Sequence, residues 1–354
     1  MGEVIIEKEK LLDSNFIDLT QKFKNYLEII KFKFDEFDNS NQNDGSRNNF
    51  VTLQKNNIFV ELDFYFEKIW AIVKNISKLD YKLYQDYYQK IILPLIEEPS
   101  EVNRQIYRKP LGYPGDYIVM NYIFDYSGNR YLGKCSYEKL INNYTCNVAF
   151  AISNVRRKDF FKKKILEIIK KDNGMKILSV GSGPARELLE LAEEGKISKK
   201  LTFTCLDLEN KVLDYVKERV KDLTDESSKF LDINYFHKNI IDLIKDKELK
   251  NLLGNQDLIY ASGLFDYLRE RFASRLTKEL FQLLNKGGSL FICNASAVNF
   301  SHRAYYELLG EWNMIHRTKE EMLSWAKNLN NISEIKFEDL TDSTNYLFFN
   351  IKKL

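Results

Sequence analysis

The sequence predicts an α/β fold in which short buried strands alternate with helices, behind an α-helical N-terminal region. Apolar runs typical of strands buried on both faces occur at residues 177–180, 201–206 and 256–260. The first run ends in a glycine turn, and leucines at helical spacing follow it. Two β-type runs, at 334–340 and 346–352, predict a final hairpin joined by a turn, so that the last strand is antiparallel to its neighbour.

The composition is that of a soluble globular chain. It has 354 residues, of which 44% are hydrophobic and 29% charged, and a formal net charge of +2 does not suggest a nucleic-acid partner. Four cysteines are scattered without a CxxC pair, which argues against a zinc site or a disulfide framework and favours a reducing cytoplasm. Residues 1–8 lack the apolar core of a signal peptide, and no apolar run reaches membrane-spanning length. We therefore expect no metal, no membrane span and a cytoplasmic location, whereas the oligomeric state is not indicated.

Three regions are expected along the chain: an α-helical domain over residues 1–105, a lid loop with connecting helices over 106–170, and an α/β domain over 171–354. In the first region, apolar residues at helical spacing predict helices at 14–36, 50–76 and 80–97. Ser14 is the expected N-cap of the first helix, a polar loop is expected at 39–49, and Pro94 should kink or end the third helix. Aromatic stripes on these helices predict packing between them, and a lipid-like ligand is the alternative.

The glycine turn is the most informative stretch. Gly181 allows a tight turn, Gly183 removes a Cβ where a ligand must come close, and the turn would aim free N–H groups at that ligand. Arg186 stands where the third glycine of the dinucleotide fingerprint would be, which argues against NAD. Asp207 ends the next strand, where a carboxylate accepts hydrogen bonds from both ribose hydroxyls of an adenosine. This pattern favours S-adenosylmethionine (SAM), and the alternative for Asp207 is a helix cap.

The stretch 109–117, Lys-Pro-Leu-Gly-Tyr-Pro-Gly-Asp-Tyr, predicts a shaped loop. We interpret it as a lid over the cofactor, with Asp116 accepting from the amino group of the methionine part; a plain structural turn is the alternative. Arg156 and Arg157 begin the helix that precedes the glycine strand. They would hold a carboxylate of the cofactor or substrate, or form a solvated face.

Two later loops follow strand ends, where ligands bind in an open α/β sheet. Asn239 and Ile240 come after the strand expected at 233–237, where an adenine ring would lie, with Asp242 or a backbone N–H at its edge. The stretch 263–267 comes after the strand at 256–260 and should carry the chemistry. A helix is expected at residues 269–284, and the glycine pair at 287–288 ends it before a strand at 289–293.

Five stretches together resemble one family of class I SAM-dependent methyltransferases, which make 3-hydroxypalmitic acid methyl ester, a bacterial signal. The resemblance covers about residues 100–354 and implies a Rossmann-like, seven-stranded core with an antiparallel last strand, under an N-terminal helical cap. Pro114 stands where the family has Ala, and the first hundred residues match no motif. The matching stretches are residues 108–117, 154–157, 181–187, 262–268 (Ser-Gly-Leu-Phe-Asp-Tyr-Leu) and 312–318 (Trp-Asn-Met-Ile-His-Arg-Thr).

The resemblance implies methyl transfer from SAM to a small-molecule acceptor, such as the carboxylate of a 3-hydroxy fatty acid, with S-adenosylhomocysteine (SAH) as product. A carboxylate needs no general base, so the site would supply an apolar tunnel and a cation, Arg317 or His302 with Arg303. A surface position is the alternative for His302, and core packing is the alternative for Phe265. The expected catalytic residues, including aromatic faces for the sulfonium, are Tyr113, Asp116, Tyr117, Phe265, Tyr267, His302 and Arg317. The expected cofactor-binding residues are Tyr113, Asp116, Arg156, Gly181, Ser182, Gly183, Pro184, Glu187, Asp207, Leu208, Asn239, Ile240, Ser262, Gly263 and Leu264.

Two other functions use the same cofactor. The amino nitrogen of SAM can attack its own γ-carbon, which gives azetidine-2-carboxylate and methylthioadenosine, and a closed lid without room for an acceptor would suit this cyclisation. A catalytically silent SAM-binding partner or sensor would bind the cofactor without turnover.

Overall fold

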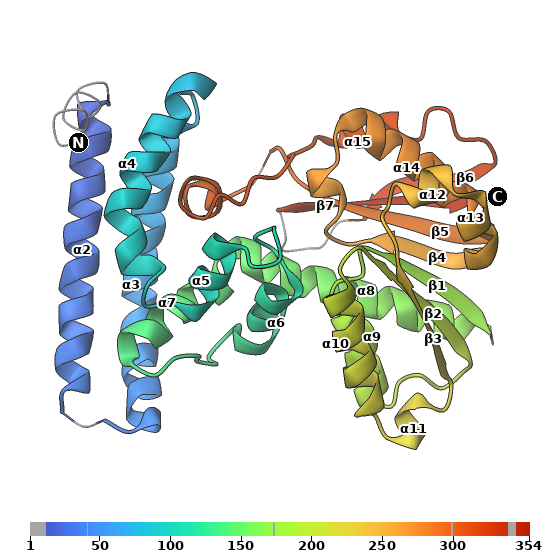
Figure 1. Ribbon diagram of the computed structural model, residues 1–354, viewed down its shortest axis with the longest axis horizontal. Coiled ribbons are helices and arrows are strands. Elements are labelled where there is room, and N and C mark those ends of the chain that lie inside the picture. Colours follow the sequence, from blue (N-terminus) through green and yellow to red (C-terminus); the bar gives the residue numbers. More distant parts are fainter. Residues whose placement is uncertain (1–11, 41, 173, 299, 339–344) are drawn as a thin grey trace. The chain divides into compact units, whose positions relative to one another are not determined.

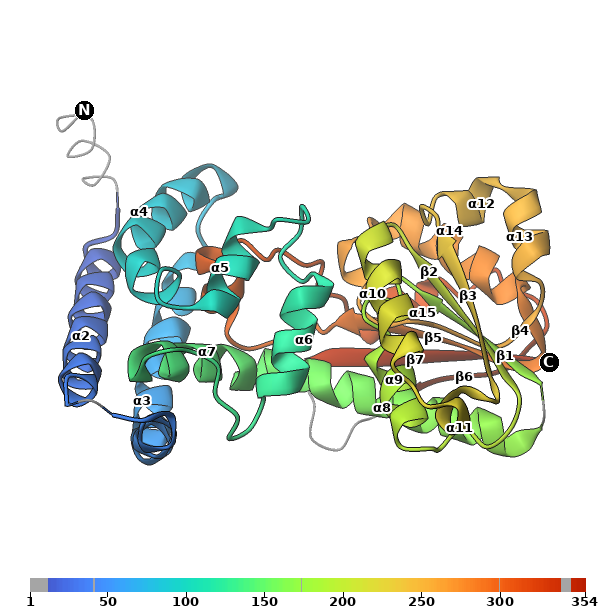
Figure 2. The same ribbon diagram turned by 60° about the horizontal axis from the view of Figure 1, so that its bottom comes forward.

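The computed structural model describes residues 12–40, 42–172, 174–298, 300–338 and 345–354 (Figures 1 and 2). It divides into two compact units, which we describe separately. The helical unit comprises residues 1–152 and 301–313, and the sheet unit comprises 153–300 and 314–354. The N-terminal residues considered for a signal peptide, and most of the turn expected between the last two strands, lie outside the described residues. The division into three regions at residues 105 and 170 stays a prediction.

Three long helices dominate the helical unit: α2 (Ser14–Asp38), α3 (Asp44–Val73) and α4 (Lys78–Ile96). Each buries one face, and α2 packs against both others, with Phe16 beside Tyr84 of α4 and Phe23 edge-on to Phe66 of α3. The aromatic stripes therefore form contacts between helices, as predicted from their spacing.

Two boundary predictions in this unit need correction. The N-cap of α2 is Asp13 instead of Ser14, because the Asp13 carboxylate accepts from the N–H groups of Asn15 and Phe16. The expected polar loop is shorter, since the Asn43 side chain caps α3 by accepting from the N–H of Ser46, and the helix starts at Asp44. Pro94 lies within the last turn of α4, which ends at Ile96, close to the end predicted for this helix.

The rest of the helical unit consists of α5 (Glu101–Arg108), α6 (Tyr117–Tyr126), α7 (Ser136–Asn147) and a π-helix, η2 (Ala304–Leu309). The η2 segment comes from late in the sequence. The side-chain amides of Gln85 and Gln89 on α4 donate to the carbonyl groups of residues 307–309, which fixes η2 within this unit. Helix α8 (Ala149–Lys171) crosses the division between the units.

The sheet unit contains a seven-stranded sheet with the order β3-β2-β1-β4-β5-β7-β6. Strands β1 to β5 are parallel, and β7 is antiparallel to both of its neighbours, β5 and β6. This confirms the predicted Rossmann-like fold with antiparallel last strands, and the chain also has the predicted N-terminal helical region. The strands are β1 (Met175–Val180), β2 (Leu201–Asp207), β3 (Leu231–His237), β4 (Gln256–Ala261), β5 (Leu284–Ala295), β6 (Ile332–Glu338) and β7 (Tyr346–Lys353).

Helices and short turns connect these strands. The glycine pair at residues 287–288 lies inside β5 instead of ending a helix, because α14 stops at Gln282 and β5 starts at Leu284. A register shift between Gln256 and Leu258 of β4 accommodates this early start. The connections are α9 (Arg186–Glu193), α10 (Asn210–Lys221), α11 (Asp225–Ser228), α12 (Asp242–Lys245), α13 (Lys247–Leu253), η1 (Phe265–Tyr267), α14 (Glu270–Gln282) and α15 (Lys319–Ser324).

The chain order of the strands reverses at β1, which lies between β2 and β4. In open α/β sheets, the crevice outside the carboxyl ends of the strands at such a reversal is where ligands bind. The strand interiors here are apolar and fully buried, with Leu178, Val180, Ile259 and Ile292 in one core cluster. A ligand is therefore expected beside the loops that follow β1, β2 and β4.

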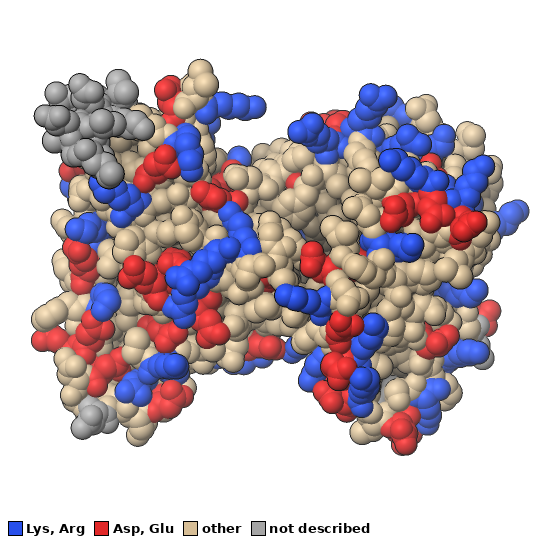
Figure 3. All heavy atoms as spheres, viewed as in Figure 1, with Lys and Arg blue, Asp and Glu red and all other residues tan. Residues whose placement is uncertain are grey.

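The surface gives little further direction. On the face shown in Figure 3, positive and negative side chains are interspersed in both units. Across the part of the chain that is described, no helix has the length and apolar character needed to cross a membrane. Each of the four cysteines, all of them described, has a free thiol.

Candidate cofactor and active site

The turn after β1 is shaped by glycines with left-handed backbone. Gly181 and Gly183 have φ values of 63° and 54°, which glycine adopts without strain. A Cβ added at Gly183 would meet no atom within 4 Å, so space lies open beside this residue. At Gly181 an added Cβ would lie 3.5 Å from Cβ of Leu264, which brings the loop after β4 next to the loop after β1. Ser182 and Pro184 are buried within the turn.

The N–H groups of this turn are not free. Gly181 and Ser182 both donate to the carbonyl of Leu206, over 2.8 and 3.2 Å, and Gly183 donates to the carboxylate of Asp207. The prediction that free N–H groups of the glycine turn face a ligand is therefore wrong for these three residues. The end of β2 accepts all three hydrogen bonds, so the turn is attached to the neighbouring strand.

Asp207, the last residue of β2, is the acceptor that joins two loops. Its Oδ2 accepts from the N–H of Gly183 and its Oδ1 accepts from the N–H of Glu209, each over 3.0 Å. Burial raises the pKa of the Asp207 carboxyl, although these backbone hydrogen bonds oppose the shift. The residue at the N-cap of α10 is Glu209, so the predicted alternative of Asp207 as a helix cap does not apply. The next residue, Leu208, is exposed.

Glu187, in the first turn of α9, is paired with Tyr260 of β4. The Tyr260 hydroxyl donates to Oε1 of Glu187, and both side chains are buried. Burial raises the pKa of the Glu187 carboxyl, and the hydrogen bond from Tyr260 opposes this. This pair ties the start of α9, and hence the glycine turn before it, to the central strand of the sheet.

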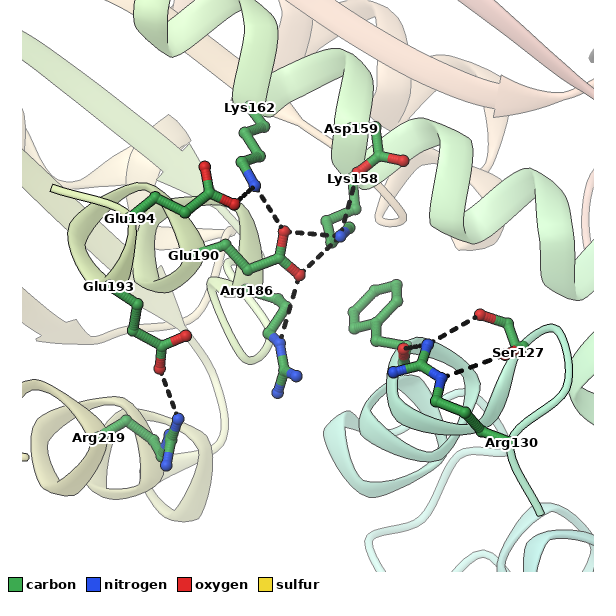
Figure 4. Close-up of polar contacts among 11 residues, drawn as sticks. Ser127, Arg130, Lys158, Asp159, Lys162, Arg186, Glu190, Glu193, Glu194 and Arg219 are labelled. Carbon is green, nitrogen blue, oxygen red and sulfur yellow. Dashed lines mark hydrogen bonds and ion pairs between the residues drawn. The ribbon is translucent and has the colours of Figure 1, made fainter. Parts of the chain in front are cut away.

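An ion-pair cluster holds α9 against α8. Lys158 and Lys162 of α8 reach Glu190 over 2.6 and 3.0 Å, and Arg186 approaches the same carboxylate to 3.5 Å (Figure 4). Burial raises the pKa of Glu190, but the two lysines outweigh it, and the net shift is downward. Arg186, which replaces the third glycine of the dinucleotide fingerprint, therefore takes part in packing these helices together.

The loop after β4 contributes small residues, a buried acid and an exposed ring. Ser262, Gly263 and Leu264 precede η1, in which Phe265 is fully buried against Trp325, the packing alternative considered for it. Asp266 is buried as well, and its Oδ1 accepts from the N–H of Ala295 over 2.6 Å. Burial raises the Asp266 pKa to about 6, while the charge of Arg157 pulls it down. Tyr267 is 42% exposed.

Arg157 is the functional candidate that the predicted site omitted in favour of Arg156. Its guanidinium lies 4.4 Å from the centre of the Tyr346 ring, and its Nη2 donates to Oδ1 of Asn154 over 2.6 Å. An added Cβ at Gly263 would lie 3.1 Å from this nitrogen, so glycine lets the guanidinium come close. Arg156 is less buried than Arg157. Helical periodicity was a usable signal, because Arg157 lies four residues before Phe161, a core residue of α8.

Arg317 supports the loop after β4. Its Nη1 donates to the carbonyl of Phe265 over 2.9 Å and to Oδ1 of Asn294 over 2.6 Å, and its Nη2 donates to the carbonyl of Leu268. Its Nε also contacts Glu270 at 3.3 Å. The side chain is buried and its donors are occupied, while the role predicted for it with an acceptor carboxylate stays a prediction.

The predicted adenine-binding stretch forms a compact turn after β3. The Asn239 side-chain oxygen accepts from the N–H of Ile241 over 2.9 Å, and Oδ2 of Asp242 accepts from the N–H of Asn239 over 3.2 Å. Ile240 is partly buried against the core. These bonds fix the turn; its contact with an adenine ring stays a prediction.

The predicted lid residues Tyr113, Asp116 and Tyr117 belong to the helical unit. The Asp116 carboxylate caps α6, accepting from the N–H groups of Ile118 and Val119, and Gln105 donates to its second oxygen over 2.6 Å. Burial raises its pKa, and these hydrogen bonds oppose the shift. They satisfy the buried acid within its own unit, and the predicted contact with the methionine amino group stays a prediction.

His302 also belongs to the helical unit, and it is buried rather than on the surface. Its Nε2 lies 3.0 Å from Oδ1 of Asp63, and its Nδ1 lies 2.9 Å from the hydroxyl of Ser301. Arg303 forms a two-pronged ion pair with Glu307, at 2.7 and 2.8 Å. The two residues predicted to orient a carboxylate therefore have partners within this unit. In the described parts of the chain, no cluster of three His, Cys, Asp or Glu side chains is arranged to hold a metal.

The fold and the three adjoining loops define a class of protein. A seven-stranded sheet with this order, a glycine turn after β1 and an acid ending β2 are the arrangement of a class I methyltransferase domain. Residues 171–342 match the family model for a methyltransferase domain. The chain therefore contains a class I methyltransferase domain. Enzymes with such a domain take their methyl group from SAM.

The chain is similar to solved structures at low sequence identity. A possible exported protein from Bordetella parapertussis is 14% identical, with a TM-score of 0.54 over 72% of this chain and 86% of that one. Magnesium protoporphyrin IX methyltransferase from Synechocystis PCC 6803, solved with bound SAM, is 10% identical, with a TM-score of 0.40 over 58% of this chain and 82% of that one. No curated protein matches the sequence.

Proposed function

We propose that this protein transfers the methyl group of SAM to a small-molecule acceptor, and that the crevice at the carboxyl ends of β1, β2 and β4 holds the cofactor. The observation that carries the proposal is the hydrogen bond between Gly183 and Asp207, beside the space left open at Gly183. It places a buried carboxylate next to a point where the backbone leaves room for a ligand.

The residues of this crevice fit the parts of SAM. The Asp207 carboxylate accepts two N–H bonds but has further lone pairs, so it can also accept from ribose hydroxyls. The methionine part would lie along Gly181, Ser182 and Gly183, and the adenine would lie against Ile240. When bound, SAM supplies an electrophilic methyl group; the residues of this chain bind it, orient the acceptor and exclude water.

For the acceptor we propose a carboxylate, such as that of a 3-hydroxy fatty acid. The support is the resemblance of the loop after β4 and of residues 108–117 to enzymes that make such an ester. A carboxylate is already anionic near neutral pH, so the site has no need of a general base, only of positioning. We further infer that the protein acts in a reducing compartment such as the cytoplasm, since its four thiols are unpaired.

Two measurements on the full chain test this function. Calorimetry with SAM and with SAH should show binding. If neither ligand binds, the proposal is overturned. Product analysis after incubation with SAM and 3-hydroxy fatty acids should give SAH and a methyl ester. Methylthioadenosine from SAM alone would indicate cyclisation instead, and tight SAM binding without turnover on any acceptor would indicate a sensor.

A further inference from the structure

Arg157 carries a buried nitrogen with an unfilled hydrogen-bonding capacity. The residue is 7% exposed, and its Nη1 has no hydrogen-bond acceptor among the described residues. Among the described residues, Oδ2 of Asp266 lies 4.0 Å from Nη1, which is within ion-pair range but too far for a hydrogen bond. An interior guanidinium is normally hydrogen bonded through all its donors, because unpaired buried donors are costly. The open donor therefore indicates a missing acceptor.

The surroundings of Arg157 orient the guanidinium and leave that donor unmatched. Asn154 takes one hydrogen bond at Nη2, and the face of the guanidinium lies over the Tyr346 ring at 4.4 Å. Gly263 allows the backbone after β4 to approach the same group. A planar guanidinium held in this way is suited to an anionic oxygen, since Arg matches carboxylate geometry.

Arg317 and Arg303, the cations predicted to orient the acceptor carboxylate, already have partners within the protein. Arg317 donates to two carbonyl groups and one side-chain amide oxygen, and it contacts Glu270. Arg303 is bound by both oxygens of Glu307 in the helical unit. An acceptor carboxylate would have to displace these partners, whereas at Nη1 of Arg157 it would meet a donor that no described residue occupies.

The position of Arg157 in the sheet unit separates it from the nucleoside. Its contacts come from the loop after β4 and from Tyr346 at the start of β7, on one side of β1 in the strand order. In the pair expected to hold the nucleoside, Gly183 lies in the turn after β1, and Asp207 ends β2, which lies on the other side of β1. Because β7 is antiparallel, its first residue lies at the same edge of the sheet as the carboxyl ends of β4 and β5.

We propose that Nη1 of Arg157 binds the carboxylate of the methyl acceptor and makes the enzyme select carboxylates over neutral analogues. The inference rests on the proposed function and adds the residue that determines specificity. In the step it serves, the acceptor oxygen forms a bond to the methyl carbon while the carbon–sulfur bond breaks, and the electron pair of that bond passes to sulfur. The carboxylate becomes a neutral ester and the sulfonium a neutral thioether. The ester binds the guanidinium more weakly than the carboxylate, which favours its release.

The test compares a charged probe with a neutral one. Binding of 3-hydroxydecanoate and of its primary amide is measured by calorimetry on the full chain saturated with SAH, in the wild type and in Arg157→Lys. The lysine keeps the charge but lacks the fork and the stacking on Tyr346. We expect the wild type to prefer the carboxylate, and Arg157→Lys to reduce that preference by about tenfold or more while SAH affinity stays within about twofold.

Two further variants keep the result interpretable. Arg275→Lys, an exposed position on α14, should change neither affinity. Asn154→Asp places a carboxylate at the atom that already accepts from Nη2, so it should reduce the preference without removing the guanidinium. This variant decides the question if Arg157→Lys does not fold.

Several results would overturn the inference. The inference fails if the wild type binds both probes equally, or if the variants leave the preference for the carboxylate unchanged. It also fails if Arg157→Lys weakens SAH binding by about tenfold and leaves that preference intact. The last result would assign Arg157 to the methionine carboxylate. A wild type that binds no SAH at all would instead refute the proposed function, so the two failures are distinguishable.

Discussion

The backbone N–H of Gly183 donates to Oδ2 of Asp207 over 3.0 Å, and this bond joins the turn after β1 to the end of β2. The other carboxylate oxygen accepts from Glu209, at the start of the connection to α10. One side chain therefore sets the separation between the two loops at the point where the strand order reverses. A change at Asp207 should alter ligand binding more than it alters the fold, because the sheet itself does not depend on this side chain.

We expect Asp207→Asn to weaken SAH binding by about tenfold or more, because it removes the charge that accepts hydrogen bonds from the ribose. The amide oxygen of the variant can still accept from the N–H of Gly183, but its NH2 group would then face the N–H of Glu209, which is also a donor. Calorimetry with SAH measures the effect, and Asp214→Asn, an exposed acid on α10, is the matched control. Equal SAH affinity in both variants and the wild type would exclude Asp207 from the binding site.

The buried pair of Glu187 and Tyr260 leads to a prediction about stability. Tyr260→Phe removes the hydroxyl that donates to a buried carboxylate, so we expect a loss of about 1–3 kcal/mol in the free energy of unfolding. Adding Glu187→Gln to the Tyr260→Phe variant should restore part of it, because the group left unpaired is then neutral. Urea unfolding of the two single variants and the double variant measures the coupling. Additive losses would show that the hydrogen bond does not stabilise the fold.

The same pair should show a pH dependence. Burial raises the pKa of Glu187 in the folded state, so the folded protein holds this proton more tightly than the unfolded chain. A protonated carboxyl needs the Tyr260 hydroxyl less than a carboxylate does. We therefore expect the deficit of Tyr260→Phe relative to the wild type to be larger at pH 7 than at mildly acidic pH. A constant or growing deficit on acidification would contradict this.

Asp266 should make stability fall as the pH rises. Its pKa in the folded state is raised from 3.8 to about 6, so unfolding releases a proton between these values and higher pH favours the unfolded chain. A rise from 3.8 to about 6 corresponds to about 3 kcal/mol in the free energy of unfolding. Asp266→Asn removes this titration while keeping an oxygen for the N–H of Ala295. The stability of the variant relative to the wild type should therefore rise from about pH 4 to pH 6 and then level off; a flat difference would refute the assignment.

Periodic stretches of the sequence predicted the sheet unit well. The strands, the glycine turn and the antiparallel last strand were all expected, because each depends on patterns within a few neighbouring residues. The boundary of α3 was missed because Asp44, Gly45 and Ser46 usually indicate a loop, whereas here Asn43 caps a helix that packing then stabilises. Local turn signals were overridden by tertiary contacts.

The site was less predictable, because its geometry depends on residues far apart in the chain. The bonds that occupy the glycine-turn amides come from Leu206 and Asp207, and the surroundings of Arg157 come from residues 263, 266 and 346. No local pattern distinguishes Arg156 from Arg157 except helical phase. The attachment of residues 301–313 to the helical unit, which fixes the location of His302, has no sequence signal at all.

Gly115 is the position at which the shaped loop meets that late segment within the helical unit. A Cβ there would overlap Cζ2 of Trp312, and the indole cannot move aside easily because Phe150 and Tyr306 both contact it edge-on. We expect Gly115→Ala to lower the free energy of unfolding by about 1–3 kcal/mol through overpacking. In a Trp312→Ala background, which is itself destabilised, the added methyl group has room and should cost almost nothing. Urea unfolding followed by circular dichroism measures the wild type, the two single variants and the double variant. An equal cost of the methyl group in both backgrounds would mean that the loop is not held against Trp312.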